Sequence, residues 1–388
     1  MNKIPNGWKE KKLKYIAEIT SSKRIYEYEY VDSGIPFYRG KEITALKNNQ
    51  KIENFIYISE KRYNELKEKY GVPSKYDILI TAVGTVGNAY TIEDDKPFYF
   101  KDGNLLWLKN IKEYPKFVEY LFECNKNILL NNFFGSVQHA LTISRLENLT
   151  FYFPPLDEQK RIASALSKID AYLENTIKLI EEKERFKRGI AKKLLTCKEG
   201  ENIPEARFKG FEDEWEIVKL GDILSYEQPK DYIVKSEEYN NKYKYPVLTA
   251  GKTFILGYTN EEFGIYNKLP VIIFDDFTTD AQYVDFPFKV KSSAIKILKS
   301  KYYNTKLIYE LIKNIKFNAR THKRYYISEY QYLKIKIPKS IKEQEDISGY
   351  LSLLDEEIDN LKKQKELIKE MKRGAMQKLL SGEVRLLE

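Results

Sequence analysis

The chain has 388 residues, of which 42% are hydrophobic and 32% charged, so two or more folded units are expected and a disordered polyelectrolyte is excluded. Its two cysteines, Cys124 and Cys197, exclude a disulfide scaffold and a cysteine-rich zinc site, and they favour a reducing cytoplasm. The net charge of +9 is compatible with a polyanionic partner, although it is spread over a long chain. No run of about 18 uncharged apolar residues predicts a membrane span, and the N-terminal residues lack the apolar segment of a secretory signal.

Residues 1–153 form the first of two blocks in which short β-like runs alternate with turn residues. Such runs occur at 76–81 and 105–108, and an apparent helix covers 115–130. This mixture predicts an α+β globule.

Residues 154–197 follow with a helical pattern. Apolar residues recur at a spacing of three to four from Leu166 to Leu194, with polar interruptions that include Lys183 and Lys187. A helix of about 40 residues is roughly 60 Å long at 1.5 Å per residue. A single amphipathic helix of this length needs a partner for its apolar stripe.

The second half of the chain has the same plan. After a connector at 196–207, the block 208–338 has β-like runs at 269–274 and 332–338 and an apparent helix at 304–316. A second long helical pattern covers 339–381, and its start, Ser340-Ile341-Lys342-Glu343, fits a capping box.

The two long segments are copies of one another. Residues 167–195 and 352–380 align without a gap at an offset of 185, and 11 of the 29 positions are identical. Further matches are Trp8, Leu13 and Ile16 with Trp215, Leu220 and Ile223; Ile143-Ser144 with Ile327-Ser328; and Glu158-Gln159 with Glu343-Gln344. The repeat predicts a fold of class α+β, with two α+β domains separated by two long antiparallel coiled-coil-like helices that are related by a pseudo-two-fold axis.

Two short motifs come close to enzyme signatures and fail at a required residue. Gly251-Lys252-Thr253 resembles the end of a phosphate-binding loop, but Pro246 stands where that loop needs glycine, so a turn is favoured. Phe153-Pro154-Pro155-Leu156 lacks the amide or acid that an amino methyltransferase uses to hold its target amine. No glycine fingerprint for a methyl donor or a dinucleotide is present.

Three further groups are ambiguous. The glycines of 84–87 favour a tight turn. Asp275, Asp276 and Asp280 are potential metal ligands, although a solvated loop is the favoured interpretation. His139 and His322 are the only histidines, so histidine-based nucleophilic or zinc chemistry lacks parts.

Both histidines lie in polar loops that precede the matching Ile-Ser pairs. Arginine and lysine in such loops suit guanine, and glutamine suits adenine. Because the position recurs in both copies, DNA contact is slightly favoured over an ordinary solvated loop. The candidate DNA-binding residues are Arg39, Lys41, Gln138 and His139 in the first block and Lys252, Arg320, His322, Lys323 and Arg324 in the second.

At this point the chain resembles the DNA specificity subunits of type I restriction–modification systems. The residues that carry the resemblance are the Trp-x4-Leu-x2-Ile starts, Ile35-Pro36-Phe37-Tyr38-Arg39-Gly40 with Tyr245-Pro246-Val247-Leu248-Thr249, Pro154-Pro155-Leu156-Asp157-Glu158-Gln159, and the Lys-Arg-Gly…Lys-Leu-Leu helix ends. Two departures occur. Pro338-Lys339-Ser340 replaces the double proline in the second copy, and Phe274-Asp275-Asp276-Phe277 replaces the glycine-rich turn.

The resemblance implies two target-recognition domains, 1–153 and 208–338, and two spacer helices, 154–197 and 339–381. Each domain would read one half of an asymmetric bipartite site in double-stranded DNA. The helices would set the unread spacer and bind two methyltransferase subunits, and a restriction subunit with motor and nuclease activity would complete the complex.

The resemblance also implies that the methyl donor, ATP and magnesium belong to these partners. We therefore expect a cytoplasmic, non-catalytic chain with no cofactor, no metal and no membrane partner. The alternatives are a stand-alone DNA-binding protein or a coiled-coil scaffold without restriction partners. An enzyme in its own right would need catalytic acids or a cofactor loop.

Overall fold

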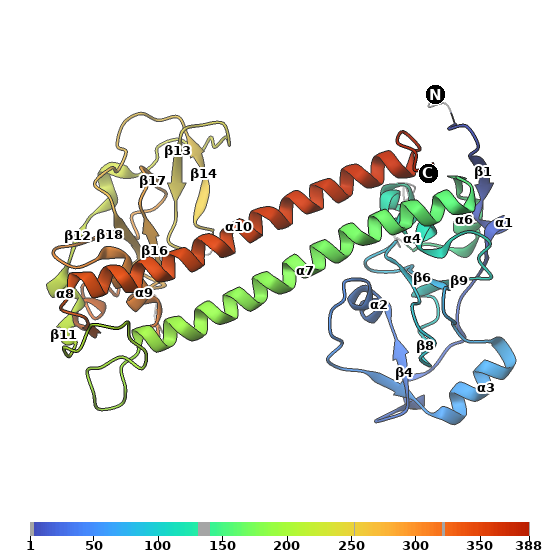
Figure 1. The fold of residues 1–388 in the computed structure, drawn as a ribbon, viewed down its shortest axis with the longest axis horizontal. Helices are drawn as coiled ribbons and strands as arrows, with labels where there is room; N and C mark the ends of the chain where they lie inside the picture. Colours follow the sequence, from blue (N-terminus) through green and yellow to red (C-terminus); the bar gives the residue numbers. More distant parts are fainter. Residues whose placement is uncertain (1–3, 131–139, 252, 320–322, 388) are drawn as a thin grey trace. The chain divides into compact units, whose positions relative to one another are not determined.

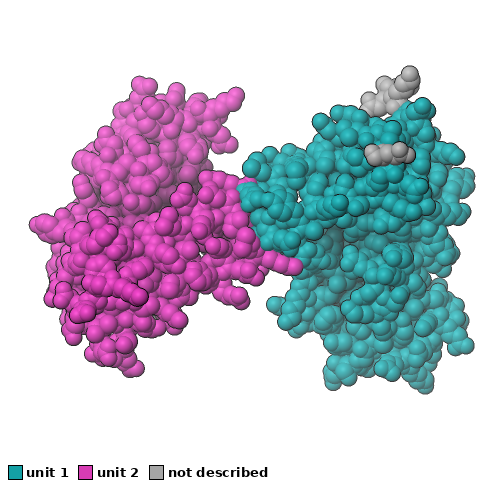
Figure 2. Space-filling model, in the orientation of Figure 1, with its two compact units in different colours: residues 1–177, 364–388 teal, residues 178–363 magenta. Residues whose placement is uncertain are grey.

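The computed structural model describes residues 4–130, 140–251, 253–319 and 323–387 (Figure 1). The chain divides into two compact units, which Figure 2 colours separately. Unit 1 comprises Met1–Ile177 with Gln364–Glu388, and unit 2 comprises Lys178–Lys363. Among the described residues, no helix is both long and apolar enough to cross a membrane.

The first block of the chain, in unit 1, contains a four-stranded antiparallel sheet, a four-stranded mixed sheet and a two-stranded ribbon. Their orders are β2-β9-β6-β7, β3-β5-β4-β8 and β1-β10. The strands are β1 (Lys9–Lys12), β2 (Glu18–Thr20), β3 (Tyr30–Val31), β4 (Ile35–Tyr38), β5 (Ile56–Ile58), β6 (Ile78–Thr81), β7 (Ala89–Thr91), β8 (Tyr99–Phe100), β9 (Leu105–Lys109) and β10 (Thr150–Phe153). All four residues of β6 are buried, which explains why this strand is a continuous apolar run in the sequence.

The α-helices of this block are short: α1 (Leu13–Ile16), α2 (Gly40–Lys47), α3 (Glu60–Tyr70), α4 (Pro115–Cys124), α5 (Lys126–Leu130) and α6 (Ile143–Asn148). The single helix predicted over 115–130 is wrong in one respect, because the structure has two helices here. The side-chain amide of Asn125 donates to the carbonyl of Leu121 at 2.9 Å and ends α4. Phe117 and Phe122 of α4 are fully buried in the core of the domain.

The second block of the chain, in unit 2, repeats this topology. Its sheets are β12-β18-β15-β16, β14-β13-β17 and β11-β19, and they correspond in order and direction to β2-β9-β6-β7, to the part around β4 and β8, and to β1-β10. The elements are β11 (Glu216–Lys219), α8 (Leu220–Ile223), β12 (Leu224–Glu227), β13 (Tyr245–Leu248), β14 (Ile255–Thr259), β15 (Val271–Asp275), β16 (Ala281–Val284), β17 (Lys289–Val290), β18 (Ile295–Ser300), α9 (Thr305–Lys313) and β19 (Lys334–Ile337). The two blocks are therefore unlike in sequence but alike in fold.

Two 40-residue helices, α7 (Leu156–Leu195) and α10 (Ile341–Leu380), each begin in one unit and end in the other. In unit 1, Leu166 of α7 shares a core with Met376 and Leu379 of α10. In unit 2, Leu194 of α7 shares a core with Leu351 of α10. Further along α7 in unit 1, Asp170 pairs with Lys372, which precedes Met376 in α10. In unit 2, Lys187 precedes Leu194 in α7, whereas its partner Asp355 follows Leu351 in α10. The predicted antiparallel pairing is confirmed.

The apolar stripe of α10 is mostly buried, although Leu361 and Ala375 within it are only half-buried. Leu351, Leu354, Ile358, Ile368 and Leu379 are all less than a tenth exposed. Burial of such a stripe supplies most of the stability of a long helix whose other faces are polar.

Candidate nucleic-acid interface

Each of the two blocks is joined to a long helix by a buried glutamine. Gln159 and Gln344 are both fully buried near the starts of α7 and α10. Gln159 accepts from the backbone N–H of Tyr114 at 2.9 Å and donates to the carbonyl of Pro154 at 2.9 Å. Gln344 makes the same two bonds, with Asn304 at 2.8 Å and Pro338 at 2.7 Å. Gln159 and Gln344 therefore act in the scaffold.

The neighbouring glutamates are also structural. Glu158 is 1% exposed and accepts two hydrogen bonds from Arg385, at 2.7 and 2.8 Å, while the Arg385 guanidinium lies 5.8 Å from the centre of the Trp8 ring. Burial opposes ionisation of Glu158, but the bonds from Arg385 outweigh it and lower the pKa of the carboxyl.

Unit 2 repeats this arrangement. Glu343 accepts two hydrogen bonds from Arg207, each of 2.8 Å, and one from the indole N–H of Trp215 at 3.1 Å. The repeated tryptophans are therefore the places where the first strand of each block is joined to the start of a long helix.

One exposed loop of unit 1 follows strand β6. Val83, Gly84 and Thr85 are exposed, and Gly84 has a φ of +78°, a conformation that favours glycine. The loop lies against α2, where the hydroxyls of Thr85 and Thr44 are 3.4 Å apart. The tight turn predicted over 84–87 therefore presents its tip to solvent.

Polar side chains continue from this loop across α2 to α5. The amide nitrogen of Asn88 donates to the Thr44 hydroxyl at 3.1 Å, and Lys126 donates to the amide oxygen of Asn88 at 2.6 Å. Burial, aided by the neighbouring Lys47, lowers the pKa of Lys126. We define Thr44, Thr85, Asn88 and Lys126 as the unit 1 reading edge.

Sequence reasoning missed this edge. Its only signal was the pair of glycines at 84 and 87, which indicates a turn but not what the turn faces. The contacts join residues 38 to 44 positions apart, so spacing along the chain could not identify them.

The corresponding loop of unit 2 follows strand β15. The backbone N–H of Tyr325 donates to the carbonyl of Asp276 at 2.8 Å, as the N–H of Leu141 donates to Ala82 at 2.9 Å in unit 1. Arg324 is exposed, and its guanidinium lies 5.8 Å from the Phe277 ring centre. We define Phe277, Thr278, Lys323 and Arg324 as the unit 2 reading edge.

The DNA-binding residues predicted from the sequence are placed as follows. Lys41 is 65% exposed at the start of α2, with its Nζ 3.6 Å from Glu42. Arg39 binds Glu42 through its side chain, at 2.8 and 3.2 Å, and closes the N-terminus of α2. Lys323 is 52% exposed and pairs with Glu329. The candidates Gln138, His139, Lys252, Arg320 and His322 lie outside the described residues.

The contact with Arg39 changes the pKa of Glu42. Burial raises the pKa of Glu42, but the hydrogen bonds from Arg39 prevail, so that the pKa is lowered overall. Arg39 is thus occupied in holding α2, which carries Lys41 and Thr44.

The potential metal ligands have other partners. Asp275 accepts from the backbone N–H groups of Phe277 and Thr278, at 2.8 and 2.9 Å. Asp276 is 1% exposed and pairs with Lys296, so the interpretation of this loop as solvated is wrong at that position. Within the described ranges, no group of three or more His, Cys, Asp or Glu residues is arranged to hold a metal ion.

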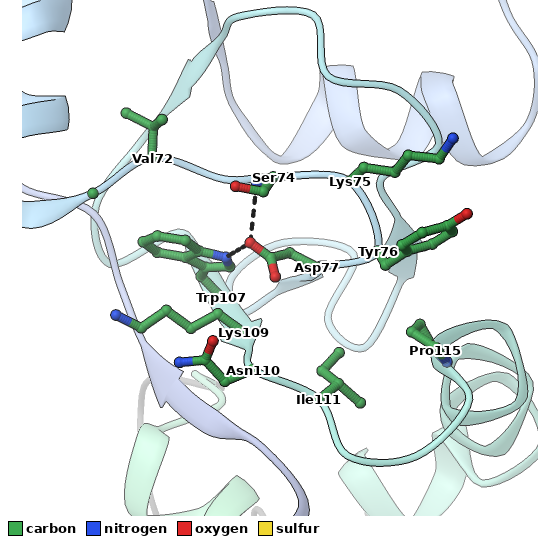
Figure 3. Close-up of a pocket in the computed structure, with 11 residues that line it drawn as sticks. Val72, Ser74, Lys75, Tyr76, Asp77, Trp107, Lys109, Asn110, Ile111 and Pro115 are labelled. Atoms are coloured by element: carbon green, nitrogen blue, oxygen red, sulfur yellow. Dashed lines mark hydrogen bonds between the residues drawn. The ribbon is translucent and has the colours of Figure 1, made fainter. Parts of the chain in front are cut away.

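A surface pocket of about 500 Å³ lies in unit 1 (Figure 3). At its centre, Asp77 accepts from the indole N–H of Trp107 at 2.8 Å and from the backbone N–H of Ser74 at 3.0 Å. Burial raises the pKa of Asp77. Because its polar centre is satisfied by the protein itself, the pocket offers no evident ligand chemistry.

Comparisons with known proteins agree with the repeat. A family model described as "Type I restriction modification DNA specificity domain" matches residues 5–182 and again 212–370. The type I restriction enzyme EcoR124I/EcoR124II specificity subunit of Escherichia coli is 51% identical over 141 residues, which cover 34% of this chain and 34% of that protein.

Two other comparisons extend over the whole chain. The type I restriction enzyme MjaIX specificity subunit of Methanocaldococcus jannaschii is 26% identical over 435 aligned residues, covering 100% of this chain and 96% of that protein. The crystal structure of a type I restriction–modification system S subunit from M. genitalium has a TM-score of 0.65 and 19% identity, covering 98% of this chain and 97% of that one. The predicted two-domain α+β fold is thereby confirmed.

Proposed function

The chain belongs to the family of type I restriction–modification DNA specificity proteins, and from this premise we propose that it selects the target sequence of such a system. In this proposal, residues 1–153 and 208–338 are target-recognition domains. Each reads one half of an asymmetric, bipartite site in double-stranded DNA. The competing interpretation, a scaffold protein without restriction partners, is not favoured by this family membership.

The observation that carries the proposal is one topology with two unlike edges. The unit 1 edge offers hydroxyl, amide and ammonium groups, whereas the unit 2 edge offers a guanidinium, an ammonium and an aromatic ring. Asparagine suits the adenine edge, arginine suits guanine, and apolar groups suit the thymine methyl. The loops that follow β6 and β15 are equivalent in the two copies, and their different side chains, Thr85 in one and Phe277 with Thr278 in the other, would read different half-sites.

The long helices carry matched apolar residues that support a second part of the proposal. Phe186 is 53% exposed and its equivalent Met371 is 50% exposed; Leu156 and Ile341, at 46% and 48%, form a second equivalent pair. Exposed apolar residues that recur at both places fit two copies of a single partner. We propose that two methyltransferase subunits dock here and that a restriction subunit joins the complex.

In this proposal the partners supply all the chemistry. The methyl donor, ATP and magnesium bind to them, and this chain contributes sequence choice and the spacing between the half-sites. A helix of 40 residues is about 60 Å long, which exceeds one DNA turn of about 34–36 Å. The site of action would be the cytoplasm.

An exchange of one block tests whether each domain reads its half-site independently. Residues 1–150 would be replaced by the corresponding block of another family member, and the methylated sites of the resulting complex would be mapped by sequencing. We expect one half of the recognised site to change and the other half to stay. A change in both halves would contradict independent reading.

A second experiment tests the DNA footprint. Lys41→Ala should weaken DNA binding across sequences and reduce the slope of log affinity against log salt by about one, because one phosphate contact is lost. Lys369→Ala is the control, since Lys369 is 48% exposed on α10, outside the recognition blocks, and pairs with Glu366. Equal slopes for Lys41→Ala and the unmodified chain would remove Lys41 from the footprint.

A further inference from the structure

Asp276 of unit 2 stands where unit 1 has Ala82. Each residue follows the third strand in its sheet order, β15 or β6, and its carbonyl accepts the hydrogen bond from Tyr325 or Leu141 that was described above. Both side chains are buried, with exposures of 1% and 0%. A buried carboxylate in one domain thus replaces a methyl group in the other.

The neighbouring strand shows the matching replacement. The registers of β9 with β6 and of β18 with β15 make Leu106 and Lys296 equivalent. Leu106 is 4% exposed and Lys296 is 1% exposed. The Nζ of Lys296 lies 3.3 Å from Oδ2 of Asp276. An alanine and a leucine of the unit 1 core are therefore replaced by a fully buried ion pair in unit 2.

This fold does not need the ion pair. Unit 1 forms the same sheet with an apolar pair, and burying two charges carries a desolvation penalty that their attraction often fails to recover. Replacement of a buried ion pair by apolar residues of similar volume is frequently neutral or stabilising. The pair is thus a feature of unit 2 whose effect must be sought in what the carboxylate holds.

The second carboxylate oxygen holds the reading edge. Oδ1 of Asp276 accepts from the backbone N–H of Tyr326 at 2.7 Å, in addition to the backbone bond to Tyr325. Lys323 and Arg324, which are both exposed, immediately precede these two residues. Ala82 has no side-chain acceptor to make such a bond in unit 1.

Lys296 orients this carboxylate and also contacts the surrounding rings. Its Nζ lies 5.1 Å from the centre of the Tyr226 ring, which packs edge-on against Tyr326 with the ring centres 5.6 Å apart. The side chain of Tyr326 is 1% exposed. The Asp276 carboxylate therefore holds the backbone of Tyr326, and the contact with the Tyr226 ring holds its side chain.

We propose that the buried Asp276–Lys296 pair is a positioning element that sets Lys323 and Arg324 for the half-site read by unit 2. This inference rests on the proposed DNA-reading function. It assigns the pair to specificity: without the carboxylate, the segment that bears Lys323 and Arg324 loses a fixed attachment, and its contacts are spread over several arrangements.

The test transplants the unit 1 residues into unit 2 of the full chain. The double variant Asp276→Ala/Lys296→Leu removes both charges together, so no unpaired charge remains buried. The full chain and the variant would each select from a library of double-stranded DNA with randomised sequence, and the enriched motifs would be compared. Thermal unfolding of both proteins would be measured in parallel.

We expect the preference in one half-site to fall by about tenfold, which is the size of one lost hydrogen bond to a charged group. The other half-site should be selected as before, and the melting temperature should stay within a few degrees. A second variant, Asp276→Asn/Lys296→Leu, keeps an acceptor for the N–H of Tyr326 and should recover most of the preference.

Three results would overturn the inference. Selection by the alanine–leucine variant that equals that of the unmodified chain would make the pair a packing feature only. An equal loss in both half-sites would indicate a general defect in folding or DNA binding. Enrichment of no sequence by the unmodified chain would contradict the proposed function itself, and this outcome is distinguishable from the other two.

Discussion

The Nζ atom of Lys372 in α10 lies 2.8 Å from Oδ1 of Asp170 in α7. The equivalent residues of the other copy, Lys187 and Asp355, form the same ion pair with the helices exchanged. A lysine in an otherwise apolar stripe lowers the stability of the helix pair, but it favours the register in which the lysine meets its carboxylate. Here the ion pair occurs twice, once in each direction. The polar interruptions in the stripe therefore determine how the helices align.

Loss of Lys372 should destabilise unit 1. The side chain is 15% exposed and also lies 2.6 Å from Glu123, so Lys372→Met leaves Asp170 without this cation and leaves Glu123 with Lys47, at 3.2 Å, as its remaining partner. We expect a loss of about 1–3 kcal/mol in the free energy of unfolding, below the range for a fully buried pair because some solvent screening remains. Urea denaturation followed by circular dichroism measures the change.

The matched control is Lys369→Met. Lys369 belongs to the same helix and pairs with Glu366, but it is 48% exposed. Its loss should change the free energy of unfolding by no more than about 0.5 kcal/mol. Equal effects of the two substitutions would show that the ion pairs of Lys372 contribute no more to stability than an exposed pair.

The buried glutamines should be equally important in both copies. Gln344→Ala leaves the N–H of Asn304 and the carbonyl of Pro338 without partners, at a cost of about 1–3 kcal/mol for each unsatisfied buried group. Gln159→Ala should produce a loss of similar or larger size, because its amide also donates to Glu113 at 2.6 Å. Thermal unfolding of both variants tests this, and a stable Gln159→Ala protein would count against the equivalence.

Two leucines two positions apart on α10 should behave differently. Leu351 is fully buried in the unit 2 core, whereas Leu353 is 61% exposed. Leu351→Ala should cost about 2–5 kcal/mol, because it creates a cavity. Leu353→Ala should stay within about 0.5 kcal/mol. Chemical denaturation of the two variants compares them directly, and similar midpoints would argue against the observed orientation of the helix.

The stability that Glu158 contributes should depend on pH. Arg385 lowers the pKa of this carboxyl below its ordinary value of 4.5, despite the opposing effect of burial. A lowered pKa means that the contribution is fully present above pH 4.5 and is lost as the pH falls through the lower pKa of the folded state.

Glu158→Gln removes this ionisation and so supplies the comparison. The difference in melting temperature between the original chain and Glu158→Gln should be largest near pH 7 and should shrink below about pH 4.5. Melting curves recorded from pH 7 to pH 3 provide the measurement. A difference that is constant over this range would show that the charge of Glu158 is not responsible.

The scaffold could be predicted from the sequence because its signals are local or repeated. Burial of Leu351, Leu354 and Ile358 follows from their helical spacing, and the Glu-Gln pairs stand out because they occur twice. A helix such as α3, with buried Tyr63 and Leu66 as its only fully buried residues, has too weak an apolar stripe to be recognised.

The contacts of the unit 1 reading edge could not be predicted because they join distant segments, whereas Lys323 and Arg324 of the unit 2 edge were among the residues predicted from the sequence. Asn88 meets Thr44 and Lys126 only after the sheet has formed. The identity of Asp276 suggested a solvated or metal-binding residue, and only the strand register reveals Lys296 beside it. Interpretation of a charged residue from the sequence fails where its partner comes from a neighbouring strand.

The division of the chain into units has a consequence for its synthesis on the ribosome. Unit 2 is one uninterrupted stretch, Lys178–Lys363, and all its core residues have been translated once that stretch is complete. Unit 1 needs Met376 and Leu379 for its core, although the rest of that core was made some 200 residues earlier. The nascent first domain must therefore wait, with part of its apolar surface uncovered, until the final helix emerges.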